Sequence, residues 1–156
     1  MDAKFINPFL IATQNVFKTM LSTHINIGKP SLKANNLALG EVTGVTGFTG
    51  DKKGTFTLSF SKESAAYIYK SMIGEDVATI NSDVVDAIGE LTNIISGQIR
   101  VELEKIGVNL SASLPTVIVG QNVAISFITR LPVIALPFNF DDRGTMRQLF
   151  IDFSFE

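Results

Sequence analysis

The sequence predicts an α+β fold in which a mainly antiparallel sheet packs against long helices. Two segments, Asp2–Leu21 and a longer one from about residue 81 to near Gly107, carry apolar residues at the 3.6-residue spacing of a helix with one buried face. Other segments alternate apolar and polar residues, as in Lys53–Ser61, which is typical of a half-buried strand. The chain also divides into two halves that each open with a helix and end in a hairpin of strands.

The first half begins with the helix predicted over Asp2–Leu21, where Pro8 is tolerated because it lies near the helix start. Its expected core face consists of Phe9, Ala12, Val16, Phe17 and Met20. Three strands are then expected, at Ile25–Lys33, Gly40–Gly50 and Lys53–Ser61.

A short helix over 62–74, stopped by Gly74, links the halves. The second half opens with the long helix, which should start at Asn81, Ser82 or Asp83 and stop near Gly107. The strands expected after it are Leu110–Gly120, Asn122–Ile128, Pro132–Phe140 and Thr145–Phe155.

The two halves, about 1–61 and 81–156, are interpreted as a diverged repeat inside a single domain that spans 1–156. The turn DKKGT at 51–55 corresponds to DDRGT at 141–145. The two helices can be aligned by matching TQNVF with LTNII, which sets Asn15 opposite Asn93 and Ala12 opposite Glu90. A proline follows each asparagine, at Pro30 in the first half and at Pro115 in the second. The alternative is that two segments of one domain share common turn chemistry.

Composition limits the possible partners. The chain has 156 residues, a formal charge of -2 and no basic stripe, which favours a protein or small-ligand partner over nucleic acid or anionic lipid. It contains no Cys, and His24 is its only histidine, which argues against thiolate chemistry and multi-histidine metal sites. Without an unbroken apolar signal core or a run long enough to span a membrane, a cytoplasmic protein is expected.

The long helix carries an unusual polar stripe. At about 100° per residue, its members fall within roughly 40° of one line along the helix, opposite a core face that includes Ile88, Leu91 and Ile95. Gly89 lies off this line and is expected to allow close packing of a neighbouring element. The stripe consists of Asp86, Glu90, Asn93, Gly97, Arg100 and Glu104.

The simplest interpretation is the solvent face of an amphipathic helix, on which Arg100 and Glu104 would pair at i, i+4 spacing. It explains Asn93 and Gly97 less well, because both disfavour mid-helix positions. A partner lying close to the helix would favour Gly97, and an amide that both donates and accepts can hold a water molecule at a defined angle. Two carboxylates one turn apart cannot flank a glycosidic bond from opposite sides, which excludes a glycosidase pair.

The spacing Asp-x3-Glu-x2-Asn followed by a distant proline, filled by Asp86, Glu90, Asn93 and Pro115, resembles the CheX/CheC/FliY family. These bacterial phosphatases dephosphorylate the chemotaxis response regulator CheY. The resemblance extends to INPFLIATQNVFKTM near the N-terminus, to GKP at 28–30 and to GELTN, and it is greatest for the CheX branch.

The resemblance implies that Asn93 orients the attacking water and that Glu90 pairs with a lysine of the regulator, while Asp86 and Pro115 have supporting roles. Gly97 and Arg100 would belong to the partner-contact face. The family further implies a homodimer, one site per chain, and Mg²⁺ supplied by the phosphorylated CheY-type receiver, with no metal or cofactor bound by this chain. The alternatives are a non-catalytic receiver-binding adaptor or flagellar-switch-type module, and a scaffold dimer whose own subunit covers the polar stripe.

Overall fold

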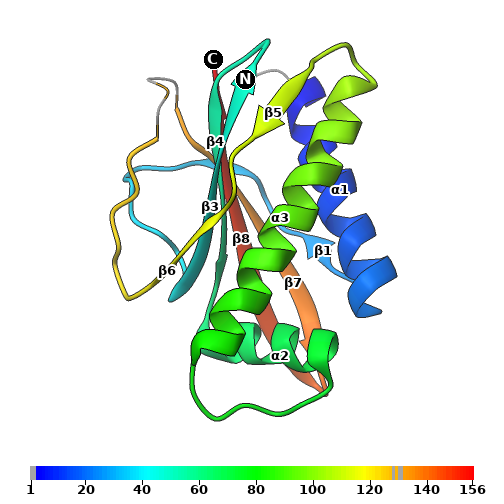
Figure 1. Cartoon of the computed structure of the whole chain (residues 1–156), viewed down its shortest axis with the longest axis vertical. Helices are drawn as coiled ribbons and strands as arrows, with labels where there is room; N and C mark the ends of the chain where they lie inside the picture. Colours follow the sequence, from blue (N-terminus) through cyan, green and yellow to red (C-terminus); the bar gives the residue numbers. More distant parts are fainter. Residues whose placement is uncertain (1–2, 128, 130–131) are drawn as a thin grey trace.

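The structure, a computed structural model, describes residues 3–127, 129 and 132–156. Its three helices lie on one side of a single sheet (Figure 1). The helices are α1 (Ala3–Leu21), α2 (Lys62–Ile73) and α3 (Ser82–Glu104). The strands are β1 (Asn26–Ile27), β2 (Ser31–Leu32), β3 (Val42–Gly50), β4 (Gly54–Phe60), β5 (Leu110–Ala112), β6 (Thr116–Val119), β7 (Ile134–Asp142) and β8 (Thr145–Phe155).

The pairings between named strands are all antiparallel, so the predicted α+β class is confirmed. β4 and β8 lie side by side at the centre of the sheet, flanked by β3 and β7. Two short strands close each side, with β1 and β2 on β7 and β5 and β6 on β3. The order of long and short strands is therefore the same from either edge, and each half of the chain contributes its hairpin to one side of the centre and its two short strands to the other. That this reflects a diverged repeat stays a prediction.

Both predicted turns connect the strands of a hairpin. The segment at 51–53 joins β3 to β4, and Asp51 Oδ2 accepts a hydrogen bond from the Asn109 backbone N–H at 2.8 Å. Residues 143 and 144 join β7 to β8. There Gly144 has φ 91°, a conformation that glycine adopts without a Cβ penalty, and its N–H donates to Asp141 Oδ1 at 3.1 Å.

Three expected strands differ from those observed. Ile25–Lys33 and Leu110–Gly120 are each split into two short strands, with Pro30 or Pro115 in the break, because proline has no N–H to donate to the sheet. The expected strand Asn122–Ile128 is reduced to one bridge, between Ala124 and Leu37, and its last residue lies outside the described ones.

An aromatic cluster joins α1 to the sheet. The Phe9 ring stacks on Phe153 with centroids 4.0 Å apart, and it also contacts Phe56 and Phe155. The expected core residues of α1 are buried with one exception, since the Met20 side chain is 47% exposed. The prediction for Met20 was wrong because no neighbouring element in the described chain covers it in the last turn of α1.

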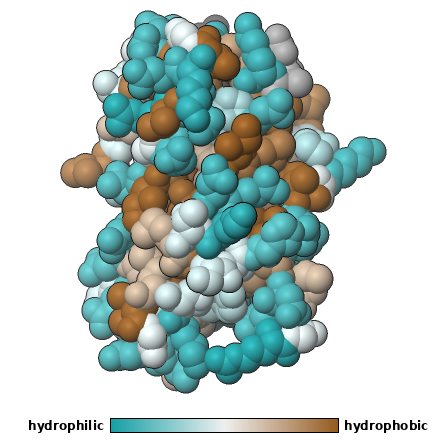
Figure 2. All heavy atoms as spheres, turned by 90° about the vertical axis from the view of Figure 1, so that its right-hand side faces the viewer, coloured by the Kyte–Doolittle hydropathy of each residue, from teal (hydrophilic) through white to brown (hydrophobic). Residues whose placement is uncertain are grey.

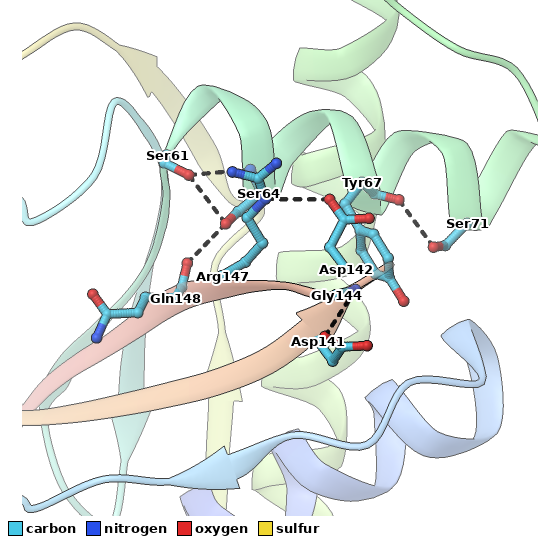
Figure 3. Close-up of polar contacts among 9 residues, drawn as sticks. All are labelled: Ser61, Ser64, Tyr67, Ser71, Asp141, Asp142, Gly144, Arg147 and Gln148. Carbon is cyan, nitrogen blue, oxygen red and sulfur yellow. Dashed lines mark hydrogen bonds and ion pairs between the residues drawn. The ribbon is translucent and has the colours of Figure 1, made fainter.

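α2 lies across one end of the sheet and is anchored at its start. Ser61 Oγ caps the helix by accepting from the Ser64 N–H at 3.1 Å, and Ser64 Oγ donates to the Gln148 carbonyl of β8 at 2.9 Å (Figure 3). The helix ends at the predicted Gly74, which has φ 89° and donates its N–H to the Lys70 carbonyl. These contacts fix the segment that leads from the sheet into α3.

The connection after β2 is tied to the centre of the sheet by a buried ion pair. Lys33 Nζ lies 2.8 Å from Asp152 Oδ2 of β8, and both side chains are almost fully buried. Burial raises the pKa of the Asp152 carboxyl, and the hydrogen bond and positive charge of Lys33 oppose that rise.

Within the described ranges, no helix has both the length and the apolar content needed to cross a membrane.

Candidate functional site on α3

The helix that carries the polar stripe has well-defined ends. Asn81, one of the three predicted caps, accepts a hydrogen bond from the Val84 N–H at 3.0 Å through its side-chain oxygen. At the other end, the predicted stop Gly107 has φ 84° and donates its N–H to the Glu104 carbonyl at 3.0 Å. All the stripe residues therefore lie within one regular helix.

α3 lies close against β3. Thr92 is fully buried, and its Oγ1 donates to the Ile88 carbonyl at 2.7 Å. A Cβ added at Gly44 of β3 would lie only 2.1 Å from Thr92 Oγ1. The bare backbone of Gly44 thus sets how deeply α3 sits on the sheet at the residue before Asn93. Sequence analysis missed this contact, although a glycine inside a strand pattern is a known signal of close approach.

A second close contact holds α3 beside the edge of the sheet. A Cβ at Gly89 would lie 3.3 Å from Val117 Cγ2 of β6, tighter than an ordinary van der Waals contact. Gly89 thus allows a neighbouring element to pack closely, as predicted. The helix is held over β3 by Gly44 and beside β6 by Gly89, and it also packs against α1 and α2. The face opposite its core residues is turned to solvent.

The polar stripe lies on that solvent face. The side chains of Asp86, Glu90 and Asn93 are exposed, as are those of Arg100 and Glu104. A Cβ at Gly97 would meet nothing within 4 Å, so the helix backbone there is open to an approaching surface. Because the chain leaves these residues uncovered, the scaffold interpretation, in which its own subunit would cover them, is not supported.

Arg100 differs from its predicted role as the helical partner of Glu104. Its Nε donates to the Leu110 carbonyl of β5 at 2.9 Å, and no ion pair with Glu104 is present among the described residues. The backbone carbonyl competes for the guanidinium because β5 passes directly beside the helix. A hollow of about 280 Å³ opens there, lined by Gly97, Arg100, Val101, Glu104, Asn109 and Leu110.

Pro115, the distant member of the motif, lies in the connection between β5 and β6. This connection passes alongside the middle of α3 (Figure 1). Ser113, two residues earlier, fixes it to β3 with two hydrogen bonds, because its N–H donates to the Gly47 carbonyl at 2.9 Å and its Oγ accepts from the Gly47 N–H at 3.0 Å. The fold thus brings the connection containing Pro115 next to the helix that carries Asn93.

The first helix offers a different set of residues at the corresponding place. Thr13 matches Thr92, since both are fully buried and each donates its Oγ1 at 2.7 Å to the carbonyl four residues earlier. This match sets Ile11 opposite Glu90 and Gln14 opposite Asn93. The expected alignment of Ala12 and Asn15 with that pair was therefore wrong by one residue, and the complete burial of Ala12 agrees with the shift.

The chemistry available on α3 is that of an exposed amide with an exposed carboxylate one turn before it. The described residues include no group of three or more His, Cys, Asp or Glu side chains arranged to hold a metal ion. The side of the molecule to the right in Figure 1 mixes hydrophilic and hydrophobic side chains (Figure 2). Such a mixture of polar and apolar area is usual at protein–protein interfaces.

Comparison with known proteins agrees with this arrangement. Residues 42–139 match the family described as chemotaxis phosphatase CheX. The CheY-P phosphatase CheX of Thermotoga maritima is 30% identical over 137 residues, which cover 85% of this chain and 88% of that protein.

Two solved structures share the whole fold. The chemotaxis protein CheX of Desulfovibrio desulfuricans has a TM-score of 0.87 and 39% identity, covering 97% of this chain and 99% of that one. A CheX–CheY–BeF3–Mg²⁺ complex from Borrelia burgdorferi has a TM-score of 0.82 and 25% identity, with 97% of each chain covered.

Proposed function

Because the chain belongs to the chemotaxis phosphatase CheX family, we propose that it dephosphorylates the phospho-aspartate of a CheY-type response regulator in chemotaxis. A relative 30% identical over most of both chains is a CheY-P phosphatase, and a similar CheX fold is known in complex with CheY. The observation that carries the proposal is the exposed pair Glu90 and Asn93 on one face of α3. Both side chains are open to a docked protein.

Asn93 would act by positioning water. Its amide oxygen can accept a hydrogen bond from a water molecule while its NH₂ group donates to another acceptor, and together these contacts fix the direction of attack. The water oxygen bonds to phosphorus, the bond from phosphorus to the aspartyl oxygen breaks, and the products are a carboxylate and inorganic phosphate. Positioning is the main demand in phosphoryl transfer, so an amide without acid or base chemistry is sufficient.

Glu90 would dock the regulator. Its exposed carboxylate lies almost one turn before Asn93 on the same face, where it can pair with a lysine of the receiver. Asp86 adds negative charge one turn earlier, and the bare backbone of Gly97 lets the receiver approach the helix. Arg100 holds β5 through its Nε, and because its side chain is exposed the guanidinium could also contact the same partner.

The remaining parts of the proposal concern the surroundings of the reaction. The receiver would hold the Mg²⁺ that neutralises charge on its phosphoryl group, and this chain would bind no cofactor of its own. The protein would act in the cytoplasm as a homodimer with one site per chain. The solved CheX–CheY–BeF3–Mg²⁺ complex supports the receiver and the ion, while the dimer rests on the family resemblance alone.

The test is the rate of phosphate loss from a Mg²⁺-bound, phosphorylated CheY-type receiver, with the wild-type protein and with Asn93→Ala. Acceleration by the wild type and its loss in the variant are expected. Binding of the receiver without acceleration by the wild type would instead identify a non-catalytic adaptor. If the wild type neither binds nor accelerates, a phosphorylated receiver is not its partner.

A further inference from the structure

Leu114 is an apolar residue that the described part of its own chain leaves almost uncovered. It lies in the connection between β5 and β6, and 85% of its surface is exposed, the largest value among the exposed large hydrophobic residues of the described chain. Scattered apolar side chains are normal on protein surfaces, so exposure alone carries no conclusion. Its position relative to Asn93 is what gives it meaning.

Two contacts fix the level of Leu114 along α3. At one end, Arg100 Nε bonds the Leu110 carbonyl at 2.9 Å. At the other end, Gly89 lies against Val117, with 3.3 Å between the position of its missing Cβ and Val117 Cγ2. The chain from 110 to 117 therefore runs beside α3 from the level of residue 100 to the level of residue 89. Interpolation between these two contacts sets Leu114, just past the middle of that stretch, near the level of Asn93.

The backbone of Leu114 is constrained on both sides. Ser113 is held to Gly47 of β3 by two hydrogen bonds, at 2.9 and 3.0 Å. Pro115 follows directly, and its ring restricts the residue before it to extended conformations. A side chain presented on a restrained backbone loses little further conformational freedom when a partner covers it. The motif proline thereby gains a physical role, since it restrains the backbone of the exposed leucine that precedes it.

We propose that Leu114 is a docking contact for the receiver, packing on an apolar patch next to the phosphorylated aspartate while Glu90 pairs with a charged group. This inference rests on the proposed function of Asn93. Both strands that flank Leu114, β5 and β6, contact α3, so a receiver seated on Asn93 would cover Leu114 as well. A second copy of this chain seated there would cover Asn93 and block the site, which makes the receiver the better occupant.

The experiment measures turnover of a Mg²⁺-bound, phosphorylated CheY-type receiver as a function of its concentration. Leu114→Ala and Leu114→Asp are compared with the wild type and with Leu32→Ala. Leu32 is the matched control because it is also an exposed leucine, at 66%, but lies in β2 on the opposite edge of the sheet. We expect KM to rise about tenfold in Leu114→Asp and less in Leu114→Ala, with kcat within about twofold of the wild type.

Thermal unfolding and sedimentation of the same variants exclude a purely structural effect. An unchanged Tm and an unchanged oligomeric state, together with the higher KM, support docking of the receiver. An unchanged KM in Leu114→Asp, while Asn93→Ala is inactive, would overturn the role of Leu114 and leave the proposed function intact. Dissociation of a dimer by Leu114→Asp, with unchanged KM, would also overturn it and assign the side chain to the second copy. No turnover by the wild type would remove both proposals.

Discussion

α1 and α3 occupy similar places in the fold but differ in what they expose. Both helices pack on the same side of the sheet, and each is followed by two short edge strands with a proline in the break. At the positions matched through Thr13 and Thr92, α3 exposes Glu90 and α1 exposes Ile11. Opposite Asn93, α1 carries Gln14, which is half-buried and whose Nε2 lies 3.5 Å from the Ile25 carbonyl.

The contacts of the two helices with the sheet also differ. β3 carries Gly44, which lets Thr92 sit directly on the sheet, whereas α1 meets the sheet through the large ring of Phe9, which stacks on Phe153 of β8. The same architecture can therefore hold the helix proposed to be catalytic on one side and a structural helix on the other. The difference lies in a few exposed side chains and in how closely each helix approaches its strand, and it predicts that activity depends on α3 alone.

The largest difference should come from the two matched amides. Asn93→Ala should reduce turnover of the phosphorylated receiver on the order of 10²-fold or more, or about 2.7 kcal/mol in activation free energy, because water is no longer held in line. Gln14→Ala should change turnover by less than about twofold. The two variants are compared by their rates of phosphate release at a saturating concentration of the receiver. Equal losses in both variants would show that α1 also takes part in the reaction.

Closeness between α3 and β3 can be tested by filling the space at Gly44. Gly44→Ala should lower the free energy of unfolding by about 1–3 kcal/mol, because the added Cβ overlaps Thr92 Oγ1 and must push the helix away. Gly47→Ala in the same strand is the control, since its Cβ would lie 3.7 Å from Ser113 Oγ, an ordinary contact. Urea unfolding measures both. A harmless Gly44→Ala would mean that the depth of α3 is not set there.

Docking by charge should depend on Glu90 and not on its counterpart Ile11. Glu90→Ala should weaken receiver binding about tenfold, or about 1.4 kcal/mol, with a smaller salt dependence than the wild type because one ion pair is lost. Ile11→Ala should leave affinity unchanged. Titration calorimetry with the phosphorylated receiver, in an Asn93→Ala background that preserves the phosphoryl group, gives both values. Unchanged affinity in Glu90→Ala would remove its docking role.

The smallest effect concerns Gly97, whose substitution should separate stability from function. Gly97→Ala should raise the free energy of unfolding by about 0.5–1 kcal/mol, since alanine favours the helix interior and the space around the site is open. The same methyl group should weaken receiver binding, because it lies on the docking face. Denaturant unfolding and receiver affinity are measured together. A variant that gains stability and keeps full affinity would show that the receiver does not approach this backbone.

The sequence alone was sufficient for features that depend on neighbouring residues along the chain. The period of apolar residues predicted α1 and the core face of α3, Asn81 and Gly107 marked the ends of α3, and Gly74 marked the end of α2. The stripe from Asp86 to Arg100 followed from helical geometry in the same way. These predictions succeeded because each interaction lies within a few residues, where local chemistry decides the conformation.

Contacts between distant segments were decided only by the tertiary structure. Sequence periodicity cannot tell that Thr92 meets Gly44, that Arg100 bonds Leu110 rather than pairing with Glu104, or that Lys33 pairs with Asp152. The residue-by-residue alignment of α1 with α3 differs by one residue from the predicted one, and this difference likewise became evident only from the burial of Thr13. A residue pattern indicates which side chains are buried and which are exposed. The partner that each side chain contacts depends on how the whole chain packs.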